Sequence, residues 1–241
     1  WEEPKKMDDP EVIKAAFEES GLDADKLMNQ MQDPEVKAKL ISNTEAAAER
    51  GVFGIPTFFV EDEMYFGKDN FIGTKINGYN LNRCIISKEA ALALKNVQND
   101  LSHFNYGLKV FDAYRPQRSV DHFVKWARNN DRKMKKIHYP DVKKRNLFKE
   151  GYIASKSGHS RGSTIDLTII DKKTGIELDM GTIYDFFGKE SWINYDGVTD
   201  LQKQNRLLLQ SVMKKFGFKP LKEEWWHFTL HNETFPDTYF N

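Results

Sequence analysis

Two short motifs in the second half of the chain constrain its fold most, because their side chains can act together only if they converge. The first, SGHSRGSTID, runs from Ser157 to Asp166, and the second is EWWH, from Glu224 to His227. Together they offer two imidazoles and a carboxylate, with another carboxylate three residues before the second histidine. This is the ligand set of a catalytic zinc site with an open coordination position.

His159 and Asp166 lie seven residues apart, so they can converge only if the chain turns at Gly162 before the strand that Asp166 begins. Taken alone, this spacing is a weak signal, because a histidine in a Gly/Ser loop is usually solvated and an aspartate before a strand often caps a turn. The second motif strengthens it. A local bend would bring Glu224 to the same cavity as His227, where a carboxylate can act as a general base toward water.

Arg115 adds a third feature. It follows Asp112-Ala113-Tyr114 and precedes Pro116, which favours an extended or turn geometry at the end of a strand. A guanidinium held there can address a developing oxyanion. Alone, an Arg-Pro pair indicates only an ordinary turn.

Composition limits the classes of partner. The 241 residues are 39% hydrophobic and 13% aromatic, enough for a sizeable core, and 36 basic residues balance 36 acidic ones. This balance argues against duplex nucleic acid binding and against a polybasic membrane patch, and it favours a small peptide-like substrate. The charges from Arg128 to Lys136 indicate a solvated basic face rather than a binding patch.

The single cysteine, Cys84, excludes an internal disulfide framework and favours a cytoplasmic protein. A periplasmic location is the alternative, because the chain begins at Trp1 rather than Met, as a chain with a processed N-terminus would. The longest apolar run, residues 51–60, is too short to span a bilayer. The oligomeric state is left open.

The first fifty residues contain two helix starts. Asp9-Pro10-Glu11 and Asp33-Pro34-Glu35 each place a capping aspartate before a proline at the first helical position. The second helix is expected to end at Gly51, a good C-terminal glycine. The sequence then predicts a hairpin, with one strand at residues 54–60 and a second at residues 64–67.

The remaining chain reads as one mixed domain. Helices are expected at residues 87–101, 119–128 and 199–216, and strands at 108–111, 165–170 and 225–230. Because the order lacks a regular βαβ rhythm, the pattern predicts an α+β fold with an antiparallel sheet and flanking helices. The expected division is an N-terminal helical and hairpin extension, residues 1–64, followed by a domain at residues 65–241.

Four segments of this second domain carry a family resemblance: FDAYRPQRSV, SGHSRGSTIDLT, MGTIYDFF and EWWHF. They resemble the zinc D-alanyl-D-alanine dipeptidases of the vancomycin-resistance type, within the larger group of D,D-peptidases related to the hedgehog zinc domain. The resemblance covers about residues 65 to 240. It implies a small D,D-dipeptide substrate and one zinc ion per chain.

Carried over residue by residue, the resemblance makes His159, Asp166 and His227 the zinc ligands. It makes Glu224 the catalytic base, and Arg115 the residue that polarises the scissile carbonyl and stabilises the tetrahedral intermediate.

The resemblance also implies three substrate-binding residues. Asp185 matches the acidic residue that receives the substrate ammonium group, Tyr65 matches a tyrosine near the same group, and Ser157 matches a serine of the substrate pocket. The structural alternatives are an exposed Asp185, a hairpin-packed Tyr65 and a turn-capping Ser157. We further expect Trp225, Trp226 or Tyr114 to line a closed pocket that rejects longer peptides. The remaining histidines are expected to be structural: His103, His122, His138 and His231.

A second resemblance covers about residues 8 to 70, through the run DPEVKAKLISNTEAAAERGVFGIPTFFVEDEMYFGKDN. It is similar to the C-terminal part of thioredoxin-like 2-hydroxychromene-2-carboxylate isomerases and kappa-class glutathione transferases. The βαβ unit that carries their active site is absent, which favours a packing or interface extension over a glutathione site.

Two further functions remain as alternatives. A D,D-carboxypeptidase acting on cell-wall stem peptides would use the same zinc ligands but leave the amino end open, and Asp185 argues against it. A non-catalytic zinc module that binds cell-wall peptides would need neither Glu224 nor Arg115.

Overall fold

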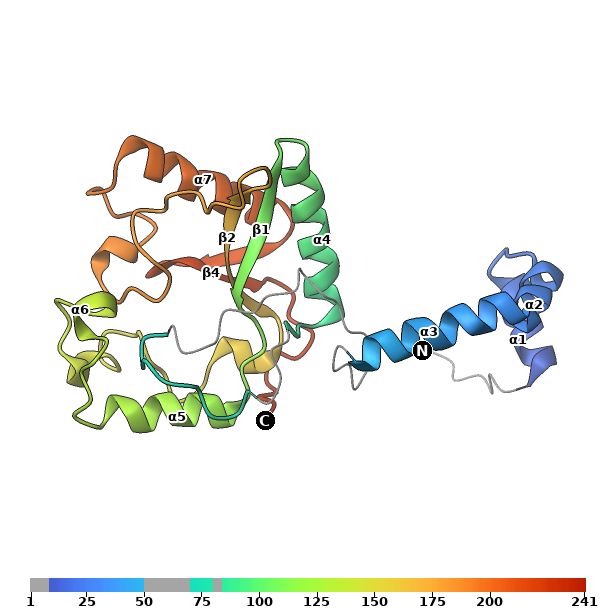
Figure 1. Cartoon of the computed structure of the whole chain (residues 1–241), viewed down its shortest axis with the longest axis horizontal. Helices are drawn as coiled ribbons and strands as arrows, with labels where there is room; N and C mark the ends of the chain where they lie inside the picture. The colour runs from blue at the N-terminus through green and yellow to red at the C-terminus, as the bar shows by residue number, and fades with distance from the viewer. Residues whose placement is uncertain (1–8, 50–69, 80–83) are drawn as a thin grey trace. The chain divides into compact units, whose positions relative to one another are not determined.

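The computed structural model describes residues 9–49, 70–79 and 84–241 (Figure 1). The chain divides into two compact units, residues 1–55 and 56–241. No helix in the described ranges is long and apolar enough to cross a membrane.

The first unit contains three helices, α1 (Pro10–Glu19), α2 (Ala24–Gln32) and α3 (Pro34–Glu49). Both predicted caps are present, because the carboxylates of Asp9 and Asp33 accept backbone N–H groups two residues ahead, at 3.0 and 2.7 Å. The sequence analysis missed α2, whose cap, Asp23, is followed by Ala24 instead of a proline. The predicted hairpin at residues 54–67 lies outside the described residues.

The second unit is built on a four-stranded sheet in the order β1-β2-β4-β3, with every neighbouring pair antiparallel. The strands are β1 (Tyr106–Asp112), β2 (Thr164–Asp171), β3 (Phe218–Leu221) and β4 (Glu224–Leu230). The predicted mixed α and β class and the antiparallel sheet are therefore confirmed. The sequence analysis missed β3, a four-residue edge strand that contains a proline.

Two long helices, α4 (Lys88–Ser102) and α7 (Asp200–Lys215), contact β1 and β3 respectively and also contact each other. Ser87 caps α4 without a capping box, whereas Thr199 and Gln202 form a complete capping box at α7. The apolar faces of these helices and the sheet form the larger core. Its fully buried members include Val97, Leu108, Leu167, Ile169, Leu209, Met213, Trp226 and Phe228.

A second core lies around α5 (Gln117–Ala127) and the segments that follow it, α6 (Lys135–His138) and η1 (Lys144–Asn146). It contains Phe71, Ile76, Phe123, Trp126, Tyr139, Leu147 and Phe187. Two short turns of 3₁₀ helix complete the unit, η2 (Gly158–Arg161) and η3 (Lys189–Ser191). Tyr79 and Tyr184 pack against both cores, so the two cores meet at these rings.

Candidate active site

The position of His159 is set by its short helix and by one strong hydrogen bond. Ser157 caps η2 by accepting the His159 backbone N–H at 3.3 Å, and Gly162 ends η2 in the left-handed conformation at φ 78°. The His159 ring is buried, and its Nδ1 donates to the Ala113 carbonyl oxygen at 2.7 Å. Because this bond uses Nδ1, Nε2 is left to face the site as a lone-pair donor to a cation.

Sheet register brings the other two candidate ligands together. Asp166 on β2 pairs directly with His227 on β4, and His227 Nδ1 lies 3.1 Å from Asp166 Oδ1. The second carboxylate oxygen of Asp166 lies 3.3 Å from His159 Nε2. One ligand atom from each of these three residues lies within 4.8 Å of the others.

This geometry fits a divalent metal. Oδ1 of Asp166 is buried and accepts no well-oriented hydrogen bond from the described residues, so its lone pairs are available to a cation. Two imidazole nitrogens and one carboxylate oxygen form a set that suits zinc better than calcium or magnesium, which prefer oxygen ligands.

The charges around His227 also favour a cation. Burial lowers the pKa of His227, but its contacts with Asp166 and Glu224 outweigh burial and raise that pKa to about 10. Burial opposes ionisation of Asp166, yet the two histidines hold its pKa well below the ordinary value. The negative charges of Asp166 and Glu224 therefore favour a positive charge at this position, as a metal ion would supply.

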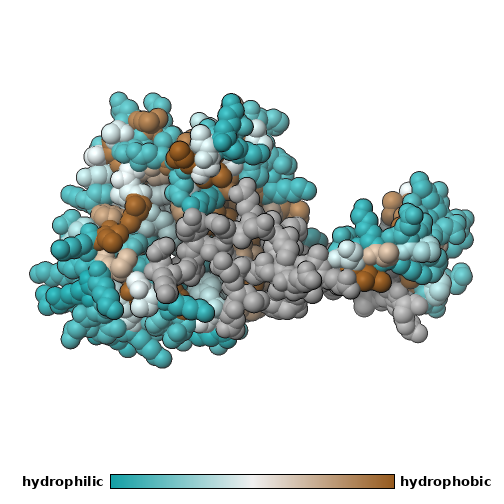
Figure 2. All heavy atoms as spheres, viewed as in Figure 1, coloured by the Kyte–Doolittle hydropathy of each residue, from teal (hydrophilic) through white to brown (hydrophobic). Residues whose placement is uncertain are grey.

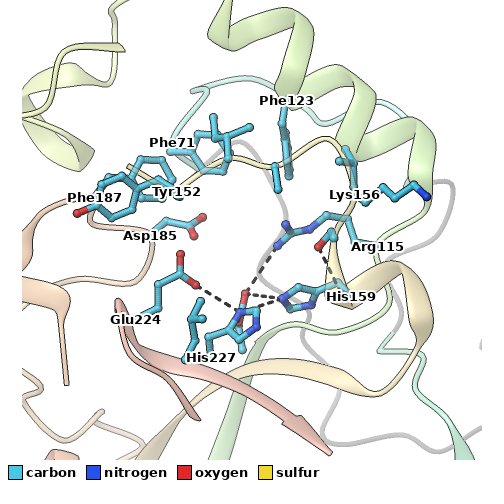
Figure 3. Close-up of a pocket in the computed structure, with 18 residues that line it drawn as sticks. Phe71, Arg115, Phe123, Tyr152, Lys156, His159, Asp185, Phe187, Glu224 and His227 are labelled. Atoms are coloured by element: carbon cyan, nitrogen blue, oxygen red, sulfur yellow. Dashed lines mark hydrogen bonds and ion pairs between the residues drawn. The ribbon is translucent and has the colours of Figure 1, made fainter. Parts of the chain in front are cut away.

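Glu224 borders this group without belonging to it. It begins β4 at the β3–β4 turn, where the strand register shifts between Pro220 and Leu221. Its Oε2 lies 3.3 Å from His227 Nδ1, and its side chain is 13% exposed. The expected bend is thus present, and Glu224 faces the same cavity as His227 (Figure 3).

Arg115 is held by a buried aspartate. Nε and Nη2 of Arg115 both contact Asp112 Oδ2, at 2.8 and 2.7 Å, and Nη2 lies 3.7 Å from Asp166 Oδ2. Burial opposes its charge, but Asp112 outweighs burial and raises the pKa of Arg115 well above its usual value. The guanidinium also lies 5.1 Å from the centre of the Phe123 ring. Arg115 is therefore a fixed cation at the edge of the candidate metal site.

These side chains surround one cavity of about 210 Å³ (Figure 3). Its polar wall contains His159, Asp166, Asp185, Glu224, His227, Arg115, Ser157 and Lys156. Its apolar wall contains Phe71, Val120, Phe123, Tyr152, Ile153, Ala154, Phe187 and Leu221.

Comparison with known proteins matches the same part of the chain. The sequence profile of a peptidase family described as D-Ala-D-Ala dipeptidase matches residues 59–241. The chain belongs to this family. D-Alanyl-D-alanine dipeptidases from Enterococcus faecalis and Enterococcus faecium are 42% and 38% identical to it over 181 residues, which is 75% of this chain and 90% of each relative. The Escherichia coli dipeptidase is 33% identical over 166 residues, 69% of this chain and 76% of that protein.

The first part of the chain matches different proteins. A DsbA-like thioredoxin domain profile matches residues 1–73. A 2-hydroxychromene-2-carboxylate isomerase from Sphingobium xenophagum is 34% identical over 61 residues, 25% of this chain and 31% of that protein. Both resemblances noted from the sequence are therefore confirmed.

Within this dipeptidase-family unit, Asp185 is buried at 6% exposure, which excludes the exposed alternative. It has a positive φ of 58°, and its Oδ2 is buried without a hydrogen-bond partner among the described residues. Burial, followed by the nearby charge of Asp166, raises the pKa of Asp185 well above the ordinary value. Asp185 is therefore a carboxyl group in the cavity wall that a cationic ligand group would stabilise.

The other predicted substrate residues differ in outcome. Ser157 both lines the cavity and caps η2, so the turn-capping alternative is observed together with a position in the cavity wall. Tyr65 lies outside the described residues. The expectation for the tryptophans was wrong, because Trp225 and Trp226 are buried in the larger core, while Phe71, Phe123, Tyr152 and Phe187 supply the aromatic wall.

Two supporting residues, Asp112 and Tyr184, were missed by sequence reasoning. Asp112 is fully buried and accepts hydrogen bonds from Tyr79 and Arg115. Tyr184 donates to Asp166 Oδ2 at 3.1 Å, and His138 Nδ1 donates to the Asp185 carbonyl oxygen at 3.0 Å. Asp112 lies in the motif FDAYRPQRSV and Tyr184 in MGTIYDFF, so both could have been found from the motifs that carry the family resemblance. His138 was expected to be structural, and its bond to a backbone carbonyl oxygen agrees with that expectation.

Proposed function

We propose that this protein hydrolyses the free dipeptide D-Ala-D-Ala, using one zinc ion per chain held by His159, Asp166 and His227. The observation that carries this proposal is the convergence of this ligand set with Glu224 and Arg115 on one small cavity. A zinc ion in such a site acts as a Lewis acid on the substrate carbonyl and makes water more acidic.

Glu224 is proposed as the general base. Its carboxylate lies beside His227 and inside the cavity, so it can take a proton from the water that attacks the peptide carbonyl. Protonated Glu224 then delivers this proton to the leaving amine. The peptide C–N bond breaks, and two free D-alanines are released.

Arg115 is proposed to stabilise the negative charge that develops on the carbonyl oxygen. Asp112 holds the guanidinium by two contacts, which fixes its direction before substrate arrives. A cation that is already oriented stabilises a developing oxyanion without having to reorganise.

Asp185 is proposed to bind the substrate ammonium group. A buried carboxyl group with an unpartnered oxygen gains most from a cationic ligand group, and the ammonium of a free dipeptide supplies one. Ser157 and Tyr65 are proposed as further substrate contacts. Because recognition of the ammonium requires a free amino end, Asp185 favours a dipeptidase over a carboxypeptidase.

At the level of the fold, we propose a hedgehog-related zinc domain at residues 65–241 and an N-terminal extension at residues 1–64 without a glutathione site. The single cysteine, Cys84, which is buried, supports a cytoplasmic location.

The proposal is tested first by metal content and by hydrolysis. We expect one zinc per chain, D-Ala-D-Ala hydrolysis that a chelator abolishes, and loss of metal in His227→Ala, because two ligands retain zinc poorly. Lys219→Ala, an exposed β3 substitution, serves as control. Hydrolysis that survives complete metal removal would contradict the proposal.

The second test concerns the amino end. N-Acetylation of the substrate removes the ammonium and leaves Asp185 unpaired, at a cost of about 1–3 kcal/mol, or roughly 5–150-fold in kcat/KM. Asp185→Asn should slow hydrolysis of the free dipeptide and narrow its advantage over the acetylated analogue. General damage to the metal site lowers both rates and leaves their ratio unchanged. Equal cleavage of free dipeptide and acetylated tripeptide by the unaltered protein would favour the carboxypeptidase alternative.

A further inference from the structure

Positive charge is concentrated between residues 128 and 149, away from the dipeptidase cavity. This segment contains nine Lys and Arg residues and two Asp and Glu residues, in a chain whose charges balance overall. Mostly hydrophilic residues cover the surface near α5 and α6 (Figure 2). A solvated face accounts for exposed charges, but part of the segment also folds around a second cavity of about 430 Å³.

The lining of this cavity is cationic. Arg128, Arg132, Lys144 and Arg145 line it, and none of the lining residues in the described part of the chain carries a carboxylate. Asp131 does not line the cavity, and its carboxylate accepts the backbone N–H of Lys133 at 3.0 Å. Burial lowers the pKa of Lys144 and outweighs the charge of Asp131, which raises that pKa. The cations around the cavity therefore repel one another, and an anion bound among them would relieve that repulsion.

Lys144 is the most informative of these cations, because it is 8% exposed and lacks an ion pair within the described part of the chain. Its Nζ donates to Asn129 Oδ1 at 2.7 Å and to the Asp131 carbonyl oxygen at 2.6 Å, and lies 3.9 Å from the centre of the Trp126 ring. Burial lowers its pKa. These bonds tie η1 to the loop after α5, and they hold a partly desolvated positive charge at the cavity wall.

The lining also has an apolar part. Ala127 lies at one side, and Phe148 presents a ring that is 37% exposed. A cavity of this volume falls in the range of small-ligand sites.

We propose that this cavity binds a small phosphorylated organic molecule, with phosphate oxygens between Arg128, Arg132 and Arg145 and the apolar part of the ligand on Phe148. The planar guanidinium groups match phosphate oxygens with paired N–H donors, which an ammonium group does not do. Phe148 distinguishes an organic phosphate from inorganic phosphate, because only the former has a surface to place against the ring.

The test uses the full chain and calorimetric titration with two probes, ADP and pyrophosphate, at physiological salt. We expect ADP to bind with one site per chain, and the double variant Arg128→Gln/Arg145→Gln to weaken both probes at least tenfold. Phe148→Ala should weaken ADP while leaving pyrophosphate unchanged. The matched control is Lys203→Gln/Lys214→Gln, which removes two exposed positive charges from α7 and should leave both affinities unchanged.

Several outcomes would overturn the proposal. Absence of ADP binding would overturn it. Equal weakening of ADP binding in the Lys203→Gln/Lys214→Gln control would also overturn it, because affinity would then depend on net charge alone. Binding of pyrophosphate but not ADP would reduce the site to one for inorganic phosphates. Tight binding of a long polyanion with no binding of ADP would indicate a polymer surface instead. D-Ala-D-Ala hydrolysis by every variant reports on folding, since none of these residues lines the dipeptidase cavity.

Discussion

Glu224 and Asp185 are two carboxylates of one cavity in different environments. The Glu224 side chain is partly exposed and lies 3.3 Å from His227, whereas Asp185 is buried and one of its oxygens has no hydrogen-bond partner among the described residues. In Figure 3 both lie on the side of the cavity opposite Arg115. Carboxylates in such different surroundings commonly have different roles. This difference supports the proposal that Glu224 carries the proton and Asp185 binds the substrate ammonium.

Glu224→Gln tests the proton-carrying role, because it preserves shape while removing the basic oxygen. We expect this variant to keep its zinc and to lose roughly 100-fold to 10,000-fold in kcat, the range for a general acid–base residue. Metal analysis and steady-state kinetics on the same sample provide the measurement. Unchanged turnover would assign the base to another group.

At the scale of elements, η2, Gly162 and β2 form the half-site that holds His159 and Asp166. Gly162 has a φ of 78°, and the nearest atom to a Cβ placed there is the backbone nitrogen of Ser87, at 3.9 Å. Space is therefore available, and the left-handed backbone conformation is what favours glycine.

Gly162→Ala should lower the free energy of unfolding by about 1 kcal/mol and should also weaken zinc affinity, because strain at the end of η2 shifts His159. Gly175→Ala is the matched control, since Gly175 has a φ of 70° with no atom within 4 Å of the added Cβ. Denaturant unfolding of the metal-free proteins should show similar losses in the free energy of unfolding for Gly162→Ala and Gly175→Ala. Competition with a chelator should show weaker zinc binding for Gly162→Ala alone, and equal affinities would remove the link between this turn and the metal site.

At the scale of the whole molecule, the candidate catalytic residues all lie in the second compact unit. The family profile begins at residue 59, close to the start of that unit at residue 56. We therefore expect a chain beginning at Pro56 to fold and to hydrolyse D-Ala-D-Ala with the kcat/KM of the full chain. Circular dichroism checks folding before kinetics are compared. A folded chain of this length without activity would assign residues 1–55 a role in catalysis.

The sequence alone predicted features that depend on neighbouring residues. Asp9 and Asp33 were identifiable as caps because a cap binds N–H groups within three residues. The candidate ligand types were also readable, since side-chain chemistry does not depend on the fold. Whether these residues hold zinc stays a prediction.

Tertiary structure decided which side chains meet. The pairing of Asp166 with His227 depends on sheet register, and the hold of Asp112 on Arg115 depends on a buried position at the end of β1. The aromatic wall of the cavity also depends on tertiary structure. From sequence, Trp225 and Trp226 were as plausible wall residues as the rings that line the cavity. Packing between distant segments decides which rings enter the core and which line the cavity, because both kinds of position favour large apolar side chains.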